Sequence, residues 1–156
     1  SGGEPTLYWE HLVGLATTFL KQSPGALVVE TNGVDLDAER LNALDALDGA
    51  ERLVLVFGMK ATSHEALAGL TGLAPAVAQR AHTSQLRNFM YAALECERLI
   101  AYGTFMDRYA DGEEYAAIGE TLRAGGVTRP LGLEVFETFG DKTKYHVPAR
   151  HRKEKG

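Results

Sequence analysis

The sequence predicts an α/β or α+β fold: a single globular domain over residues 4–149 with a short sheet, a crossover helix, a helical middle and a C-terminal β-hairpin. Three observations predict it. The chain has 156 residues, 45% of them hydrophobic, which suits one core better than two small ones. Strand-like and helix-like segments alternate in the first sixty residues. Two short apolar segments near the C-terminus flank Gly140 and Asp141, a turn-forming pair.

The first helix is predicted to begin at Thr6, which can act as its N-cap, and to extend to about Leu20. Apolar residues recur over this stretch at i, i+3, i+4 and i+7, which gives one continuous apolar face. Residues 23–25, which are serine, proline and glycine, end the helix. Residues 26–30 then predict a short buried strand before a turn.

A second helix is predicted to follow, with Asp35 or Asp37 as its N-cap and an end near Gly49. Residues 52–57 form the next strand. Their apolar side chains are consecutive rather than alternating, which predicts a strand covered on both faces. The order strand, helix, strand favours a right-handed crossover between two parallel strands.

The middle of the chain is predicted to be helical. Thr62 and Glu65 have the spacing of a capping box, so a helix should begin there and end at Gly72. Pro75 is suited to the first turn of the next helix, because its missing N–H has no partner in that turn anyway. Helical spacing of apolar residues then continues to about Ala101.

The last third of the chain contains one ambiguous segment. Residues 102–110 either extend the preceding helix or form a strand. Residues 111–114 offer an N-cap for another helix, which should end at residues 125–126, both glycines. Residues 133–138 and 143–147 are predicted to form an antiparallel hairpin.

The charge balance argues against a generally basic surface. Lys and Arg number 16 against 21 Asp and Glu, a formal net charge of -5, which disfavours a nucleic-acid coat or a polybasic membrane binder. Residues 150–156 are an exception, because this basic stretch includes Arg152 and Lys153. We expect it to be a flexible tail, either a solubilising one or one that contacts phosphates.

Several classes of protein are disfavoured by what the sequence lacks. With Cys96 as the single cysteine, an internal disulfide is impossible, which favours a reducing, cytoplasmic setting. No apolar run approaches the roughly 18 residues of a membrane span, and the start does not resemble a secretory signal. The histidines lack metal-binding spacing, and neither phosphate-loop nor dinucleotide motif is present. We therefore expect no metal, no cofactor and no membrane association.

One stretch resembles the helix-turn-helix DNA-binding motif. It spans residues 65–81 and has a small residue, Ala68, on the first helix, Gly72 at the turn, and Ala78 and Ala81 where the second helix would pack inward. The resemblance implies a recognition surface that reaches base edges or phosphates. It would consist of Gln79, Arg80, His82 and Thr83. The alternative is a pair of packed helices with no role in DNA binding.

A second candidate site follows from the predicted parallel strands, because open α/β sheets bind ligands beyond the carboxyl ends of their strands. Residues 30–32 follow the first strand and residues 58–64 the second. The second segment offers a cation, hydroxyl groups and the N–H groups of a helix start, which suit an anionic ligand. The predicted ligand-binding residues are Lys60, Thr62, Ser63 and His64. Helix capping and solvent exposure are the alternative explanation.

Three functions are compatible with these patterns. The first is a non-catalytic regulatory binding protein, DNA-associated through the helix-turn-helix-like element and homo-oligomeric, most simply a homodimer. The second is a small α/β enzyme or sensor that binds a phosphate-bearing molecule at residues 60–64. The third is a protein–protein interaction module. The absence of a recognisable catalytic motif favours binding over catalysis.

Overall fold

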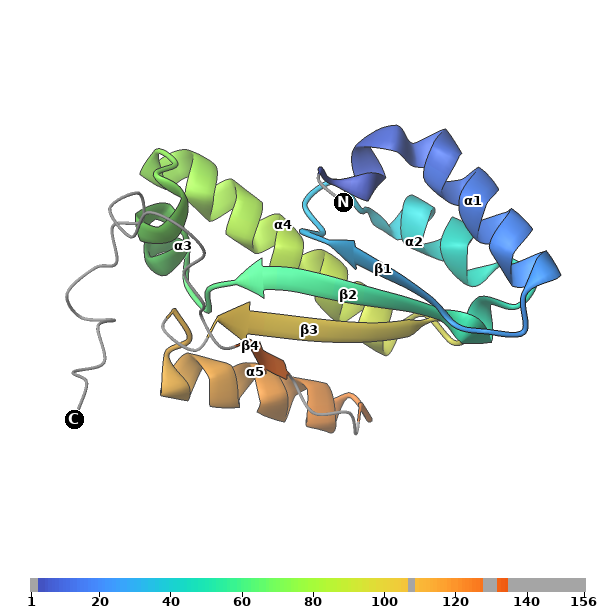
Figure 1. Cartoon of the computed structure of the whole chain (residues 1–156). Helices are drawn as coiled ribbons and strands as arrows, with labels where there is room; N and C mark the ends of the chain where they lie inside the picture. Colours follow the sequence, from blue (N-terminus) through green and yellow to red (C-terminus); the bar gives the residue numbers. More distant parts are fainter. Residues whose placement is uncertain (1–2, 107–108, 128–131, 135–156) are drawn as a thin grey trace.

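Four strands pair in parallel in the order in which they occur along the chain, β1-β2-β3-β4, and helices connect them (Figure 1). The computed structural model describes residues 3–106, 109–127 and 132–134. The strands are β1 Leu27–Thr31, β2 Leu53–Lys60, β3 Ile100–Met106 and β4 Gly132–Glu134. The helices are η1 Pro5–Tyr8, α1 Trp9–Gln22, α2 Ala38–Asp45, η2 Ala50–Arg52, α3 His64–Thr71, α4 Pro75–Leu94 and α5 Gly112–Ala124. Of the two predicted classes, α/β and α+β, the structure is α/β, and the predicted single domain is confirmed.

The parallel register brings the carboxyl ends of the strands to one edge of the sheet. Leu27 pairs with Leu53 and Thr31 with Phe57, so β2 extends beyond the end of β1. On the other side Val54 pairs with Ile100. Figure 1 shows α4 passing behind β2 and β3, and α1 and α2 beside β1. The loops after β1 and β2 therefore lie at the same edge, where ligand sites of such sheets form.

The two faces of β2 differ in exposure. Its inner face, which we define as Leu53, Leu55, Phe57 and Met59, is at most 1% exposed and belongs to the core formed with α1, α2, α4 and α5. Its outer face, defined as Val54, Val56, Gly58 and Lys60, is partly exposed in the described part of the chain. The prediction that both faces are covered is therefore wrong for the described residues.

The helix predicted to reach residue 101 ends at Leu94, and residues 100–106 form β3. Asp45 explains part of this difference. Its carboxylate accepts hydrogen bonds from the backbone N–H groups of Arg98 and Leu99, at 2.8 and 2.6 Å, and fixes the loop between α4 and β3. Because Asp45 is more than fifty residues away in sequence, local spacing could not reveal this anchor.

Two of the predicted N-caps are wrong by a residue or two. Glu4, rather than Thr6, caps the first helical turn, and Thr6 is buried. Ser63, rather than Thr62, caps α3 by accepting from the N–H of Ala66. By contrast, Asp37 caps α2 and Asp111 caps α5, both within the predicted stretches. The side chains of Thr62 and Glu65, which the sequence assigned to a capping box, are therefore available for other contacts.

The predicted C-terminal hairpin falls largely outside the described residues. Its first strand, 133–138, overlaps β4, and Leu133 pairs in parallel with Phe105 of β3 rather than with an antiparallel neighbour in the described part. Residues 143–147 and the basic tail at 150–156 lie outside the described ranges. Among the described helices, none combines the length and apolar character needed to cross a membrane.

Candidate functional site

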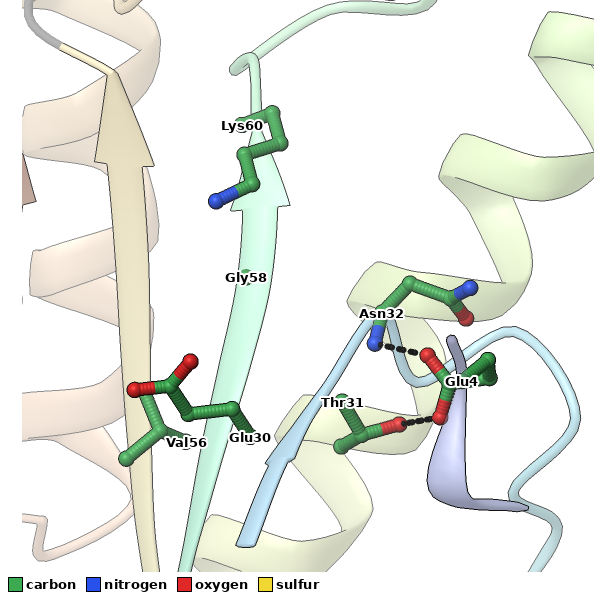
Figure 2. Close-up of a pocket in the computed structure, with 7 residues that line it drawn as sticks. All are labelled: Glu4, Glu30, Thr31, Asn32, Val56, Gly58 and Lys60. Carbon is green, nitrogen blue, oxygen red and sulfur yellow. Dashed lines mark hydrogen bonds between the residues drawn. The ribbon is translucent and has the colours of Figure 1, made fainter. Parts of the chain in front are cut away.

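A pocket of about 160 Å³ lies at the carboxyl ends of β1 and β2 (Figure 2). It is lined by Glu4, Glu30, Thr31, Asn32, Val56, Gly58 and Lys60. The residues come from three separate segments: the start of the chain, the end of β1 and the second half of β2. The pocket therefore exists only in the folded sheet, at the position where parallel sheets place their ligands.

Glu4 forms one wall of this pocket, and its carboxylate is already hydrogen-bonded to other parts of the chain. Its carboxylate accepts hydrogen bonds from the Thr31 hydroxyl at 2.5 Å and from the Asn32 backbone N–H at 2.7 Å. It also accepts one from the Thr6 hydroxyl at 2.8 Å. Several donors share its negative charge, so Glu4 holds the start of the chain against the end of β1.

Lys60 brings a cation to the opposite wall. Its backbone has φ 66°, a left-handed conformation that costs a residue with a side chain about 1–2 kcal/mol. The pairing of β2 with β3 shifts register between Gly58 and Lys60, which places a bulge at this point. Backbone strain of this kind is concentrated at functional sites.

Gly58 leaves the space that the Lys60 side chain uses. A Cβ atom on Gly58 would lie 3.4 Å from both Cε and Nζ of Lys60. Figure 2 shows the Lys60 side chain turned back along β2, so that its ammonium points toward the side of the pocket that holds Glu30. A larger residue at position 58 would push the ammonium away from the sheet.

Glu30 supplies an acid on the outer side of the sheet. It pairs in register with Val56 and is exposed. In Figure 2 Glu30, Val56 and Lys60 project on the near side of the strands, while the helix ribbon passes behind them. The pocket thus combines the Lys60 ammonium, the exposed Glu30 carboxylate, the already hydrogen-bonded Glu4 carboxylate, Asn32 and the apolar side chain of Val56. These groups suit a small molecule that carries both charges.

The predicted anion-binding residues do not converge on one point. Lys60 lines the pocket, but Thr62 is buried and donates its hydroxyl to Glu114 at 2.7 Å while accepting from the Asp111 N–H at 2.8 Å. Ser63 caps α3, and His64 contacts Glu65 at 3.2 Å. A carboxylate beside Thr62 opposes the binding of an anion there.

The helix-turn-helix-like pair is present as α3 and α4, joined through Gly72 in the left-handed conformation, φ 73°. Ala78 is fully buried at the contact, as expected for a close crossing. Of the predicted recognition residues, Gln79, Arg80 and Thr83 are exposed. His82 is half-buried, and Arg152 and Lys153 lie outside the described residues.

His82 packs against the loop that follows β2. Burial lowers the pKa of His82, while hydrogen bonds to the backbone of Ala61 and Thr62 and the charge of Glu114 oppose that shift. The nearby His64 lowers the pKa further. The imidazole therefore holds α4 to the end of β2 rather than facing a nucleic acid.

Sequence reasoning pointed to the ends of both strands but selected residues only after the second. Glu30 and Asn32 directly follow or end the first strand, so their position was a usable signal. Glu4 had no such signal, because its partner Thr31 is 27 residues away in sequence. Long-range hydrogen bonds of this kind are set by the folded sheet.

Other reactive groups do not add a catalytic set to the described residues. No group of three or more His, Cys, Asp or Glu is placed there to hold a metal ion. Burial raises the pKa of the Cys96 thiol to about 11, with further contributions from Asp45 and Glu95, so the thiol is a poor nucleophile. Comparison of the chain with protein-family models, curated proteins and solved structures finds no match.

Proposed function

We propose that this domain is a non-catalytic binding module that recognises a small zwitterionic molecule in the pocket between β1 and β2. The observation that carries the proposal is the placement of Lys60 and Glu30 on the same side of the sheet, at its carboxyl edge, in one pocket. Lys60 would contact an anionic group of the ligand, and Glu30 would contact an ammonium or another donor.

Size and charge narrow the class of ligand. A volume of about 160 Å³ is below the roughly 300–1,000 Å³ of pockets that hold drug-sized molecules. It suits a ligand of amino-acid size better than a nucleotide. Glu30 would repel a second phosphate or carboxylate group, so a polyanion fits less well than a zwitterion.

The residues that line the pocket also favour ligand binding over catalysis. Its described side chains include neither a histidine nor a cysteine, and the Thr31 hydroxyl is already donated to Glu4. A nucleophile with an adjacent general base is therefore not assembled in this pocket. Binding that orders the loops after β1 and β2 is the function that these residues can perform.

A thermal-shift titration tests this proposal. The probes are glycine, alanine and serine as zwitterions, inorganic phosphate and AMP as anions, and methylamine as a cation. A ligand at 100 times its Kd stabilises the folded state by about 2.7 kcal/mol, which raises Tm by roughly 5–10 °C for a domain of this size. We expect the zwitterions to raise Tm more than either single-charge class.

Variants distinguish a Tm increase caused by binding in the pocket from one caused by a general change in charge. Lys60→Ala and Glu30→Gln should each remove the zwitterion response, because each deletes one of the two charges that the ligand contacts. Lys21→Ala is the matched control, since Lys21 is an exposed lysine in the last turn of α1. A response that survives both pocket variants, or no response to any zwitterion, would refute the proposal.

A second candidate function is DNA binding by α4, and one observation favours it. This 20-residue helix contains no acidic residue, and Gln79, Arg80 and Thr83 are exposed near its start. The neighbouring helices α2 and α5 carry acidic residues, Glu39, Glu113 and Glu114 among them, which weakens attraction to the phosphate backbone.

Fluorescence anisotropy with a labelled duplex at two salt concentrations tests this second candidate. Arg80→Ala should weaken binding and reduce the slope of log K against log salt by about 1 if Arg80 contacts a phosphate. Arg123→Ala, in the last turn of α5, is the control for a general loss of charge. Equal effects of the two variants, or no binding at low salt, would exclude α4 as a DNA-reading element.

A further inference from the structure

Strand β1 forms one edge of the sheet. It is the first strand in the sheet order and pairs with β2 alone in the described part of the chain. Figure 1 shows β1 as the outermost strand, with α1 beside it. An edge strand presents backbone N–H and C=O groups that can pair with another extended segment.

A groove of about 930 Å³ runs along this edge between β1 and the η1–α1 segment. Tyr8, Leu12 and Leu15 form much of its helical wall, and Val28 belongs to the strand wall. Tyr8, Leu15 and Val28 are 73%, 47% and 56% exposed, and they are three of the six large hydrophobic residues found exposed in the described part of the chain. Clustered exposed apolar side chains next to a free strand edge indicate a binding surface rather than chance exposure.

The charges around the groove decide between possible occupants. Glu4 and Glu30 are the acidic residues that line it, His11 and the Tyr8 phenol are also present, and its described lining contains neither lysine nor arginine. A second copy paired edge to edge would bring the same acidic groups against these. A basic segment with alternate apolar residues would pair its cations with this acidic rim, chiefly with the exposed Glu30 carboxylate because Glu4 is already hydrogen-bonded, and would place its apolar side chains against α1.

We therefore propose that β1 and α1 form a docking groove for an extended peptide segment of a partner protein, in which apolar residues alternate with lysine or arginine. The segment adds as a strand beside β1, so its backbone provides hydrogen bonds and its side chains provide selectivity. This interaction differs from ligand binding between β1 and β2, although the two surfaces share Glu4 and Glu30. Lys60 belongs only to the pocket and Leu15 only to the groove, so variants of these two residues distinguish the surfaces.

The test uses a fluorescently labelled synthetic peptide of alternating valine and lysine, titrated with the whole chain. Two matched peptides replace every lysine by glutamate, or the central valine by proline, which removes a backbone N–H. We expect the valine–lysine peptide to bind at least about tenfold more tightly than either, which corresponds to about 1.4 kcal/mol. Its affinity should fall at high salt, because the Glu30 carboxylate of the rim is exposed.

Leu15→Lys should abolish binding of this peptide, because it replaces an exposed leucine of the apolar wall by a charge of the same sign as the lysines of the peptide. Val77→Lys is the control, since Val77 is 39% exposed on α4, outside the groove. Lys60→Ala should leave peptide affinity within about twofold, so failure of the pocket proposal and failure of this one are distinguishable. Circular dichroism verifies that each variant is folded.

Three results would overturn the inference. One is equal binding of the valine–lysine and valine–glutamate peptides, which would remove the role of the acidic rim. Another is binding that Leu15→Lys does not change. The third is a dimer in analytical ultracentrifugation that Leu15→Lys converts to a monomer, because a second copy would then occupy the groove.

Discussion

The two faces of β2 perform different tasks although the strand is apolar at almost every position. On the inner face, Phe57 packs against Phe89 of α4 with ring centroids 5.6 Å apart, and both are at most 2% exposed. On the outer face, Val56 and Gly58 form part of the polar pocket with Lys60. One face of the strand therefore contributes to the core, and the other contributes to a candidate ligand site.

This difference predicts that stability and binding can be separated within a single strand. Neighbouring residues point to opposite faces, so a substitution and its control can be one position apart. Inner-face changes should alter the free energy of unfolding, and outer-face changes should alter ligand response. The variants that follow test that separation, beginning with the largest expected effect.

The pair Leu55→Ala and Val56→Ala tests the separation most directly. Leu55 is 1% exposed in the core, so its truncation should reduce the free energy of unfolding by about 2–5 kcal/mol. Val56 is partly exposed, and its truncation should reduce that free energy by about 1 kcal/mol or less. Urea unfolding measures both. Equal losses would mean that the outer face is as well packed as the inner one.

Two glycines provide a second pair with a smaller effect. A Cβ at Gly103 would lie 2.8 Å from Met59 Cε and from Phe89 Cζ, both in the core, so Gly103→Ala should destabilise by about 1–3 kcal/mol. At Gly58 the nearest atoms are 3.4 Å away and belong to the end of the Lys60 side chain. Gly58→Ala should change stability by less than about 1 kcal/mol.

The readout for Gly58→Ala is therefore the zwitterion response, which should weaken because the new methyl group comes into contact with the Lys60 ammonium and shields it from the ligand. Gly103→Ala should leave that response intact in the fraction of protein that is folded. The reverse pattern, with loss of response only in Gly103→Ala, would move the ligand site away from the outer face.

Position 60 allows the backbone and the side chain to be tested apart. Lys60→Ala and Lys60→Gly both remove the side chain and its contacts, so their difference reports only the left-handed backbone at φ 66°. Glycine adopts this conformation readily, and we expect Lys60→Gly to be more stable than Lys60→Ala by about 1 kcal/mol in urea unfolding. Neither variant should respond to zwitterions. Equal stability of the two would show that the strain at residue 60 relaxes.

The sequence narrowed the class to α/β or α+β and predicted the parallel pairing of the first two strands and the ends of α3 and α5, because glycines and regular apolar spacing specify these locally. It could not predict the exposure of Val56, since an apolar residue in a strand looks the same on either face. Nor could it place Glu4 or Asp45, whose hydrogen bonds join segments 27 or more residues apart. Five of the seven residues that line the pocket lie in the two predicted strand-end segments, and only Glu4 and the exposed side of Val56 depend on tertiary contacts.

The smallest expected effect concerns His82, an ionisable residue on the helix-covered side of the fold. Burial lowers the pKa of His82 below 6.5, and the nearby His64 lowers it further. Hydrogen bonds to the backbone of Ala61 and Thr62 and the charge of Glu114 oppose this shift. Below about pH 6.5 the unfolded chain then binds more protons at this residue than the folded one. Stability contributed by neutral His82 is thus fully present above pH 6.5 and is lost as the pH falls through the folded-state value.

Thermal unfolding between pH 7 and pH 5 should therefore show a fall in Tm that is smaller in His82→Gln, because glutamine does not titrate and retains an N–H donor for the loop carbonyls. His11→Gln is the control, since His11 is exposed on α1. If the wild type and His82→Gln lose the same Tm over this range, protonation of His82 does not oppose folding. The packing of α4 on the loop after β2 would then tolerate a charged imidazole. The difference in burial between the two faces of β2 would in that case not continue into the loop that follows the strand.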